Sequence, residues 1–594
     1  MSFRAPWSVR MLVLLGLLLA AASVRWRIIG DDGHGWKDII ISDGAGYHAY
    51  WSMVLEPGWR PAAEARPDHV VPAGNAMVIK YMVGTSLMQA PMVLMAHSIG
   101  LALGATPDAR AFRYQIAVAI GGILWTFIGL VALRALLLRM GFEDRAVALS
   151  LLIILAGTGL VQHAVMSPGM SHPCSFAAVA LLLLSVHRAW HEVSVRWTIV
   201  AAGLFAVVLL IRPVNGIVLL AVPALVSEGA VSPLRWWHVA GRRAVLPGAV
   251  LFVAMLSLQP LVWYLQSGTC FVRPYGGEGF HWLRPQLWKS LFGAQKGLFF
   301  HWPLLLLGLP GAVILWRRSP MAGAALTMHG MAMVHLTSAW WSWEYGDSYG
   351  PRPYLDHLPV AAVPMTTLLG SFTRRAARIL WWSLLPFIAL QLFHAWQYTV
   401  GIIHPFNMDL EKWRAIRLRT DASWRGALGG DLEPPPYAPC GMELVMRTSA
   451  HGGKVAPPWE ENAATRPEGP GGNTFLVDSD HPFGPTLRVG PAELPTGQAF
   501  HIEASLRRGE PRPGSGQDAL VVTTLGRPGS AREHYAFRLN DVPFAGTWRR
   551  WRYAYRMPAA RPGEQLSWYV WQPGNGEILL DSISIRITAV RPCE

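Results

Sequence analysis

The chain is poor in charged residues and in cysteine. Among its 594 residues, 15% are charged and four are cysteine, whereas 52% are hydrophobic and 28 are tryptophan. A soluble protein carries about 25% charged residues, so this composition excludes an ordinary soluble enzyme. Apolar runs of about 20 residues are long enough to cross a bilayer. The sequence therefore predicts a polytopic α-helical membrane protein.

The sequence also lacks the common signatures of nucleotide and zinc binding. It contains no P-loop, no dinucleotide fingerprint and no zinc-type cysteine spacing. The net charge of +14 comes mostly from arginines in short clusters between apolar runs, which is typical of cytoplasmic loops rather than of a nucleic-acid surface. We expect membrane lipids around the chain and no nucleic-acid partner.

Placing these arginine clusters in the cytoplasm predicts about eleven spans. The spans are expected at about 9–26, 114–137, 146–165, 174–190, 197–211, 214–229, 245–266, 302–316, 320–339, 355–371 and 379–401. The odd number places the C-terminal tail outside the cytoplasm. The N-terminus, with Arg4 and Arg10 before an apolar run, resembles a signal peptide, and the later spans favour a retained signal anchor.

The run from Val83 to Gly104 is apolar enough to span as well. A span there would turn every later arginine cluster outward, against the positive-inside rule. We therefore expect a helix that lies at the outer surface or dips into it.

Composition changes near residue 404, where Pro, Gly and Arg become frequent and spanning runs end. We predict a transmembrane catalytic domain at 1–403 with a first outer loop at 28–112, a linker at 404–471, and an extracytoplasmic β-sandwich domain at 472–594. Eight short strands with Gly and Pro turns indicate the sandwich. Its ending, "GEILLDSISIRI", is similar to the last strand of jelly-roll carbohydrate-binding modules. For Trp568 and Trp571, core packing is favoured over stacking on a sugar.

Cysteine pairing stays open. Cys440 and Cys593 bracket the tail, and in an oxidising compartment a disulfide between them would close the domain. Cys174 and Cys270 are expected on the same side of the membrane, so that three full pairings exist.

With this topology the most polar motifs all fall on the outer face. They are "SDGAGYHAY", "IKYMVG", "SPGMSHPCS", "IRPVN", "RPYGGEGFHW", "AQKGLFFHW" and "WSWEYGDSYGPRPYLDH". Ionisable groups near membrane depth are costly and are therefore often functional. This convergence indicates one site.

Asp43 is the candidate catalytic residue of this site. Aromatic neighbours would shield it from water and raise its pKa, so that it accepts a proton from a hydroxyl. The alternative is an Asp that caps a helix starting near Tyr47.

Three cations are candidates for binding a phosphate without a metal, namely Lys80, Arg212 and Arg352. For Arg212, snorkelling to lipid headgroups is the alternative. The candidates for binding a sugar or an acceptor are polar or aromatic residues of the same motifs, namely Tyr47, His48, Tyr81, His172, Glu278, Glu344 and Asp347. Oxygen ligands from Glu344 and Asp347, or from Asp31 and Asp32, are an alternative that would hold a divalent ion, but we expect no metal or other cofactor.

Taken together, these motifs resemble the membrane glycosyltransferases of the GT-C superfamily. The matching features, across about 8–415, are "SDGAGYHAY" in a long outer loop, "KY…G…L…AP", "RPVN" between spans, and "GDSYGPRPYLDHLP". The chain is similar to protein O-mannosyltransferases and lipid A aminoarabinose transferase, and most of all to a bacterial branch with "DG-x-GYY-x-Y" and "SFGPR". That branch has Tyr–Tyr where this chain has Tyr47–His48, which leaves the role of His48 open.

The resemblance implies a sugar donor on polyprenyl phosphate and transfer to a glycan, lipid or protein acceptor outside the cytoplasm. It also implies a bacterial inner membrane location with a periplasmic C-terminal domain. The family's catalytic acid matches Asp43, and "SDG" in place of paired acids supports metal-independent chemistry. As a hypothesis, the acceptor oxygen attacks from the face opposite the lipid phosphate, so that the configuration inverts. The alternatives are a transporter or flippase of a lipid-linked glycan, and a non-catalytic sugar-binding membrane protein. A transporter should show repeats or mid-span charges, and neither is evident.

Overall fold

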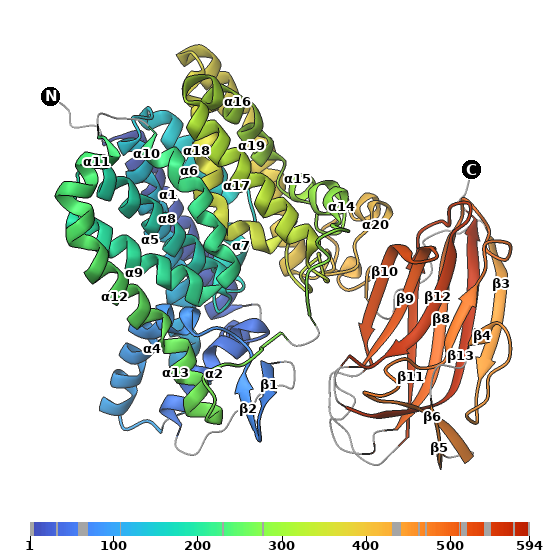
Figure 1. Ribbon diagram of the computed structural model, residues 1–594. Helices are drawn as coiled ribbons and strands as arrows, with labels where there is room; N and C mark the ends of the chain where they lie inside the picture. Colours follow the sequence, from blue (N-terminus) through green and yellow to red (C-terminus); the bar gives the residue numbers. More distant parts are fainter. Residues whose placement is uncertain are drawn as a thin grey trace. The chain divides into compact units, whose positions relative to one another are not determined.

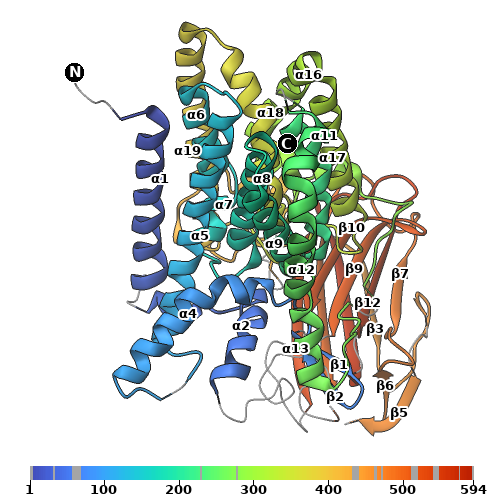
Figure 2. The ribbon, with the colours of Figure 1, turned by 60° about the vertical axis from the view of Figure 1, so that its left-hand side comes forward.

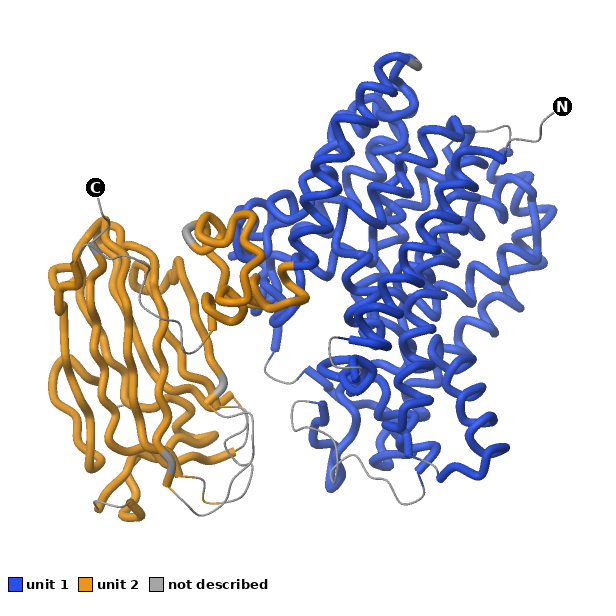
Figure 3. The backbone as a smooth tube through the Cα atoms, turned by 180° about the vertical axis from the view of Figure 1, so that it is seen from behind, with its two compact units in different colours: residues 1–396 blue, residues 397–594 orange. Residues whose placement is uncertain are grey.

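The structure is a computed structural model that describes most of the chain. The described residues are 5–30, 34–56, 69–106, 108–227, 231–275, 278–430, 441–460, 464–469, 472–509, 511, 519–539, 548–573 and 576–591. They form two compact units, residues 1–396 and residues 397–594 (Figure 3).

The first unit is a bundle of helices, as Figure 1 shows. Its main helices are α1 (Trp7–Ser23), α5 (Phe112–Arg139), α6 (Asp144–Ala156), α7 (Leu160–Val165), α8 (Ser171–His191), α9 (Val195–Ile211), α10 (Val222–Val226), α12 (Arg242–Leu256), α13 (Leu258–Ser267), α16 (Gly308–Arg318), α17 (Pro320–Ala339), α18 (Leu358–Ser371) and α19 (Arg374–Thr399). Each expected span falls on one helix or on consecutive helical segments. Five segments are long and apolar enough to cross a membrane, namely Trp7–Ile29, Phe112–Arg139, Ser171–His191, Pro233–Ser267 and Arg375–Thr399. The protein is a membrane protein, while the count of eleven spans stays a prediction.

Residues 28–112, the predicted first outer loop, include ordered secondary structure. They contain η2 (Gly35–Asp38), α2 (Asp43–Leu55), the hairpin of β1 (Val70–Ala73) and β2 (Ala76–Ile79), and α4 (Gly84–Ala102). The apolar run at 83–104 is therefore a helix, as predicted. It contains Pro91 and is not among the five long apolar segments. Figure 2 shows α4 running obliquely to α1 and α5.

A proline sets the junction between α9 and the short 3-10 helix η4 (Pro213–Ala221). A residue that precedes proline is disfavoured in the helical region. Arg212 accordingly has φ −153° and ψ 112°, an extended conformation. The helix therefore stops at Ile211, and Arg212 lies at the break, where the sequence analysis expected it.

The second unit contains two antiparallel sheets. Their strands are β3 (Gly441–Ala450), β4 (Trp459–Glu460), β5 (Ala464–Gly469), β6 (Gly472–Val477), β7 (Thr486–Val489), β8 (Ala499–Gly509), β9 (Leu520–Arg527), β10 (Ser530–Arg538), β11 (Arg549–Met557), β12 (Gln565–Trp571) and β13 (Ile578–Arg591). One sheet has the order β10-β9-β12-β7-β4, and the other has the order β11-β8-β13-β6-β5 with β3 also paired to β13. The eight predicted strands are all present.

Residues 404–471, which the sequence analysis assigned to a linker, contain ordered elements. They include α20 (Leu410–Ala415) and the strands β3, β4 and β5. β3 has little sequence signal because only one of its ten residues, Ala450, is buried. It is a strand because it pairs along β13, from Gly441 opposite Arg591 to Ala450 opposite Ile583. That partner lies more than a hundred residues away, so the local sequence does not reveal it.

One cluster of buried side chains draws on both sheets of the second unit, for example on Phe475 from β6 and Trp568 from β12. Trp568 is completely buried, so the preference for core packing over sugar stacking is confirmed for this residue. Trp571 is only partly buried and stacks on Phe483 with ring centroids 6.5 Å apart. Cys440 and Cys593 lie outside the described residues, whereas Cys174 and Cys270 are free thiols.

Close helix packing in the first unit depends on glycine. A Cβ atom added at Gly311 of α16 would lie 1.8 Å from the backbone oxygen of Pro364 in α18. Small residues allow such backbone approach in membrane bundles. We predict that Gly311→Ala lowers the free energy of unfolding by about 1–3 kcal/mol, because the helices must move apart. Thermal unfolding in detergent measures this.

The matched control is Gly330→Ala in α17, where a Cβ atom meets nothing within 4 Å. This variant should be neutral or more stable by up to about 1 kcal/mol, since Ala favours helix over Gly. Equal unfolding temperatures for the two variants would show that the α16–α18 contact is looser than described.

Candidate functional site

Asp43 begins α2, but its side chain does not cap that helix. Its Oδ1 atom accepts a hydrogen bond from the Tyr81 hydroxyl at 2.9 Å. Its Oδ2 atom accepts one from Nη1 of Arg352 at 2.7 Å. The helix begins at Asp43 rather than near Tyr47, so the capping alternative is wrong. The carboxylate is held at two points and still keeps 28% of its side-chain surface accessible.

The glycines of "SDGAGYHAY" explain how Tyr81 reaches Asp43. A Cβ atom at Gly46 would lie 2.1 Å from the Tyr81 ring, so only glycine lets that ring lie against α2. On the next residue, the ring of Tyr47 lies 4.8 Å from the ring of Tyr81, centroid to centroid. Gly44 faces the backbone of Gly169 in the same way, with 3.1 Å to a Cβ atom. The two glycines of the motif therefore let the Tyr81 ring and the Gly169 backbone lie close to the start of α2, where Asp43 is.

Arg352 opens the 3-10 helix η7 (Arg352–His357), directly after Gly350 and Pro351. Gly350 has φ +65°, and a Cβ atom there would lie 3.0 Å from the Trp302 ring. This position therefore requires glycine for its backbone conformation and for the close ring. The turn directs Arg352 to Asp43, and its side chain is 13% exposed. The Arg352 Nε atom is buried and has no hydrogen-bond partner among the described residues.

A second carboxylate, Asp356, lies one turn further along η7 and is completely buried. It accepts hydrogen bonds from Nδ1 of His172 at 2.7 Å and from the Asn215 amide at 2.8 Å. Nη1 of Arg212 lies 3.6 Å from its Oδ2 atom. The motifs "RPVN" and "YLDH" thus meet at this acid.

Behind Asp356 the hydrogen bonds continue into the bundle. The Asn215 amide oxygen lies 3.3 Å from Nε2 of His357, and the other ring nitrogen of His357 lies 3.0 Å from Nε2 of His329. All of these side chains are buried. The sequence analysis treated His172 as a candidate for sugar or acceptor binding, but the structure places it at Asp356, 1% exposed.

Opposing effects set the charge of Asp43. Burial raises its pKa, but the Arg352 guanidinium, the Tyr81 hydrogen bond and the more distant charge of Arg212 bring that pKa below its ordinary value. The sequence analysis expected a raised pKa, because it took account of the aromatic neighbours and not of an ion pair 309 residues away. That expectation is wrong. Asp43 is ionised at neutral pH.

The positive charge of Arg212 acts on three tyrosine hydroxyls, those of Tyr47, Tyr275 and Tyr345. Burial raises the pKa of each hydroxyl, and the charge of Arg212 opposes that rise. They therefore remain protonated and able to donate hydrogen bonds. The sequence analysis missed Tyr275 and Tyr345, although both lie in quoted motifs, because it singled out the acids there. The sequence signal that could have identified them is their position within three residues of an acid, Glu278 or Glu344.

The residues around the two carboxylates, namely Asp43, Tyr81, Arg352, Asp356, Arg212, Tyr47, Tyr275 and Tyr345, are called the Asp43 cluster below. Lys80 and Glu278 form an ion pair at its edge, with their side chains 20% and 25% exposed. The Lys80 Nζ atom also lies 5.0 Å from the ring centroid of Tyr275, and Trp341 donates to the other Glu278 oxygen at 3.3 Å. Lys80 was predicted to bind phosphate and Glu278 to bind a sugar or acceptor. In the structure the two side chains bind each other.

The remaining candidates are His48, Glu344 and Asp347. Nε2 of His48 lies 2.7 Å from the Ala109 carbonyl oxygen, and burial lowers its pKa to about 4, so it is a neutral buried group on the other side of α2. Glu344 accepts from Ser342 at 3.0 Å, and burial raises its pKa. Asp347 is exposed.

A buried lysine supports the loop that carries Glu344 and Asp347. Lys296 is 3% exposed, and its ammonium group donates to the Ser348 carbonyl and, at 3.2 Å, to the Ser348 hydroxyl. Burial lowers its pKa to about 7. This residue anchors the turn just before Arg352.

Metal-binding side chains do not gather in the part of the chain that the structure describes: no group of three or more His, Cys, Asp or Glu residues there could hold an ion. Asp31 and Asp32 lie outside the described residues. Glu344 and Asp347 thus have no third ligand of these types beside them within the described ranges.

Comparison with known proteins gives similarity at the level of solved structures alone. No protein-family model matches the chain, and no curated protein matches it. The chain is similar to apo ArnT from Cupriavidus metallidurans, with 16% identity and a TM-score of 0.38 over 70% of this chain and 67% of that one. It is also similar to the oligosaccharyltransferase of Archaeoglobus fulgidus, with 13% identity and a TM-score of 0.39 over 71% of this chain and 59% of that one. The chain spans about three fifths of the archaeal enzyme's length.

A third similarity concerns a much smaller protein. The CBM22-1 xylan-binding domain of Paenibacillus barcinonensis Xyn10C matches with 14% identity and a TM-score of 0.18, over 25% of this chain and 97% of that one. ArnT and the archaeal oligosaccharyltransferase belong to the GT-C glycosyltransferases, the superfamily that the motifs of this chain resemble. Each of these three TM-scores is below 0.5.

The lowered pKa of Asp43 makes a prediction about stability. The ion pair with Arg352 stabilises the fold fully above the unfolded-state pKa of about 4 and loses that effect as pH falls through the lower folded-state pKa. The unfolding temperature of the wild type should therefore exceed that of Asp43→Asn at pH 7, and the difference should shrink towards pH 3. Asp347→Asn, an exposed acid, is the control and should show no such trend. A difference that grows in acid would contradict the assignment.

Proposed function

We propose that this protein is a membrane glycosyltransferase that moves a sugar from a polyprenyl-phosphate carrier to an acceptor hydroxyl. The observation that carries the proposal is an ionised and partly accessible carboxylate, Asp43, fixed by Tyr81 and Arg352 within the field of a second arginine, Arg212. Glycosyl transfer from a lipid phosphate needs a base for the acceptor and a cation for the leaving phosphate. The Asp43 cluster contains both kinds of group.

Asp43 is the general base in this proposal. It takes the proton of the acceptor hydroxyl while that oxygen attacks the anomeric carbon from the face opposite the phosphate, and the configuration inverts. A lowered pKa makes a carboxylate a weaker base, so its advantage is that it is ionised and oriented. Arg352 and Tyr81 provide that orientation, and they leave part of the carboxylate open to the acceptor.

Arg212 is the best placed cation for the departing phosphate. Its nearest carboxylate oxygen is 3.6 Å away and its side chain is 23% exposed, which leaves guanidinium donors for an incoming anion. The neutral hydroxyls of Tyr47, Tyr275 and Tyr345 lie in its field and offer further donors. Lys80 and Arg352 are already paired with Glu278 and Asp43, so we assign them to the rim of the phosphate site.

The wider setting belongs to the same proposal. The reaction would take place at the extracytoplasmic face of a bacterial inner membrane, with the C-terminal unit in the periplasm. The two sheets of that unit would form a jelly-roll β-sandwich. In this scheme Arg212 supplies the positive charge that stabilises the departing phosphate, so the proposed reaction uses no metal.

The first test concerns the base. Asp43→Asn should lower sugar transfer by a factor of about 100 to 10,000, the usual contribution of a general base. The measurement is the mass of surface glycans in a deletion strain complemented with wild type or variant, with variant abundance determined in membranes. Asp480→Asn, an exposed acid of the second unit that is not among the candidate site residues, is the control and should restore the glycan. Normal glycan in the Asp43→Asn strain would refute the base assignment.

The second test concerns the phosphate. Arg212→Gln should weaken binding of undecaprenyl phosphate to the purified protein and slow transfer by a factor of about 100 to 1,000. Arg318→Gln, an exposed arginine at the end of α16, is the matched control and should leave both unchanged. Unchanged lipid-phosphate affinity in Arg212→Gln would remove Arg212 from the donor site.

A further inference from the structure

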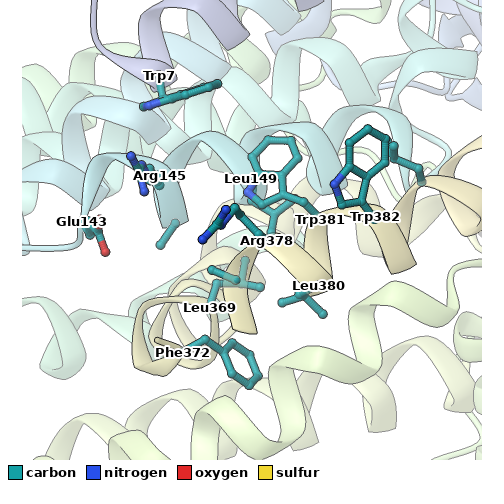
Figure 4. Close-up of a pocket in the computed structure, with 13 residues that line it drawn as sticks. Trp7, Glu143, Arg145, Leu149, Leu369, Phe372, Arg378, Leu380, Trp381 and Trp382 are labelled. Atoms are coloured by element: carbon teal, nitrogen blue, oxygen red, sulfur yellow. The ribbon is translucent and has the colours of Figure 1, made fainter. Parts of the chain in front are cut away.

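A cavity of about 340 Å³ lies at another place in the first unit (Figure 4). None of the residues that line it belongs to the Asp43 cluster. They come from α1, α6, α18 and α19 and from the residues that join or flank these helices, namely Trp7, Glu143, Arg145, Ala146, Leu149, Leu369, Phe372, Ala377, Arg378, Leu380, Trp381, Trp382 and Leu385. The cavity therefore needs its own explanation.

The lining is apolar except for three charged side chains. Arg145 and Arg378 carry positive charge and Glu143 carries negative charge, which leaves a net charge of +1 in the lining. Arg145 also lies over the Trp7 ring at 5.9 Å from its centroid. Figure 4 shows the Arg145 and Arg378 head groups on the side of the cavity where Glu143 lies, away from Trp382. The cavity thus has a charged end and a hydrocarbon end.

The ends of three apolar segments locate this cavity in the membrane. The segment Trp7–Ile29 begins at a lining residue, Arg375–Thr399 begins three residues before Arg378, and Phe112–Arg139 ends four residues before Glu143. Tryptophan and arginine at span ends are typical of the headgroup level. The outer-loop elements α2 and α4 lie at the other end of α1 (Figure 2), so this is the end where the arginine clusters predict cytoplasm.

We propose that the cavity binds one anionic phospholipid of the cytoplasmic leaflet. Arg145 and Arg378 bind the phosphodiester, and one acyl chain lies against Leu149, Leu369 and Leu385. Charge complementarity favours this occupant, since a single phosphodiester charge matches the net charge of +1, and basic pockets between helices on the cytoplasmic side suit such headgroups. A small soluble phosphate would leave the hydrocarbon end of the cavity empty. This site is independent of the glycosyltransferase proposal.

Lipid titration by native mass spectrometry tests the headgroup contacts. Phosphatidylglycerol should bind the wild type more tightly than phosphatidylcholine. Arg145→Gln and Arg378→Gln should each weaken phosphatidylglycerol binding about fivefold, and the double variant about twenty-five-fold, because one arginine near the surface is worth about that factor. Arg243→Gln, an exposed arginine of α12 that is not in the lining, is the matched control. Equal affinity in the double variant and the wild type would overturn the proposal.

A second pair of variants tests the acyl chain without changing charge. Ala377→Trp should fill the cavity and weaken phosphatidylglycerol binding, whereas Ala376→Trp, next to it on α19 but not in the lining, should not. Glycerol 3-phosphate serves as the soluble probe. If it competes with the lipid at equal concentration, the cavity is a site for soluble phosphates and the lipid assignment is overturned. Unfolding temperatures in detergent establish that each variant is folded.

Discussion

The ion pair between Asp43 and Arg352 is the contact on which the polar site depends. It joins the start of α2 to a residue 309 positions later in the chain. With side chains 28% and 13% exposed, the pair is largely removed from water. Desolvating two charges is costly unless geometry and further hydrogen bonds compensate. The hydroxyl of Tyr81 supplies one such bond, and the glycines at 46 and 350 provide the space in which ring and backbone approach.

The two carboxylate–arginine pairs of the cluster differ in a way that separates their roles. Asp43 and Arg352 lie 2.7 Å apart, so each occupies much of the other's bonding capacity. Arg212 lies 3.6 Å from Asp356, whose oxygens are instead bonded to His172 and an amide. Asp356 therefore orients Arg212 more than it neutralises it. An anion that enters the cluster meets one engaged arginine and one that still has donors to offer, which is why Arg212 is assigned to the leaving phosphate.

Local patterns predicted the elements well, because hydropathy and alternation are properties of neighbouring residues. All expected spans are helical, and all eight strands exist. What failed depends on distant partners. β3 is a strand because of β13, the sign of the Asp43 pKa shift depends on Arg352, and His172 turns to Asp356. Motif spacing placed the acid and the cations on one face, but it could not say which acid pairs with which cation.

The charge balance of each site decides its ligand. Around Asp43, cations and acids are present in similar number, so a bound phosphate is opposed by carboxylates and can leave again. That balance suits a group that departs during a reaction. In the cavity beside Trp7, two arginines face one glutamate above a hydrocarbon wall. The lining holds one carboxylate, Glu143, beside two arginines. The excess positive charge, together with apolar contact, favours an occupant that stays bound. In the two proposals the same residue types, arginine and aromatics, would serve turnover near one end of α1 and lipid retention at the other.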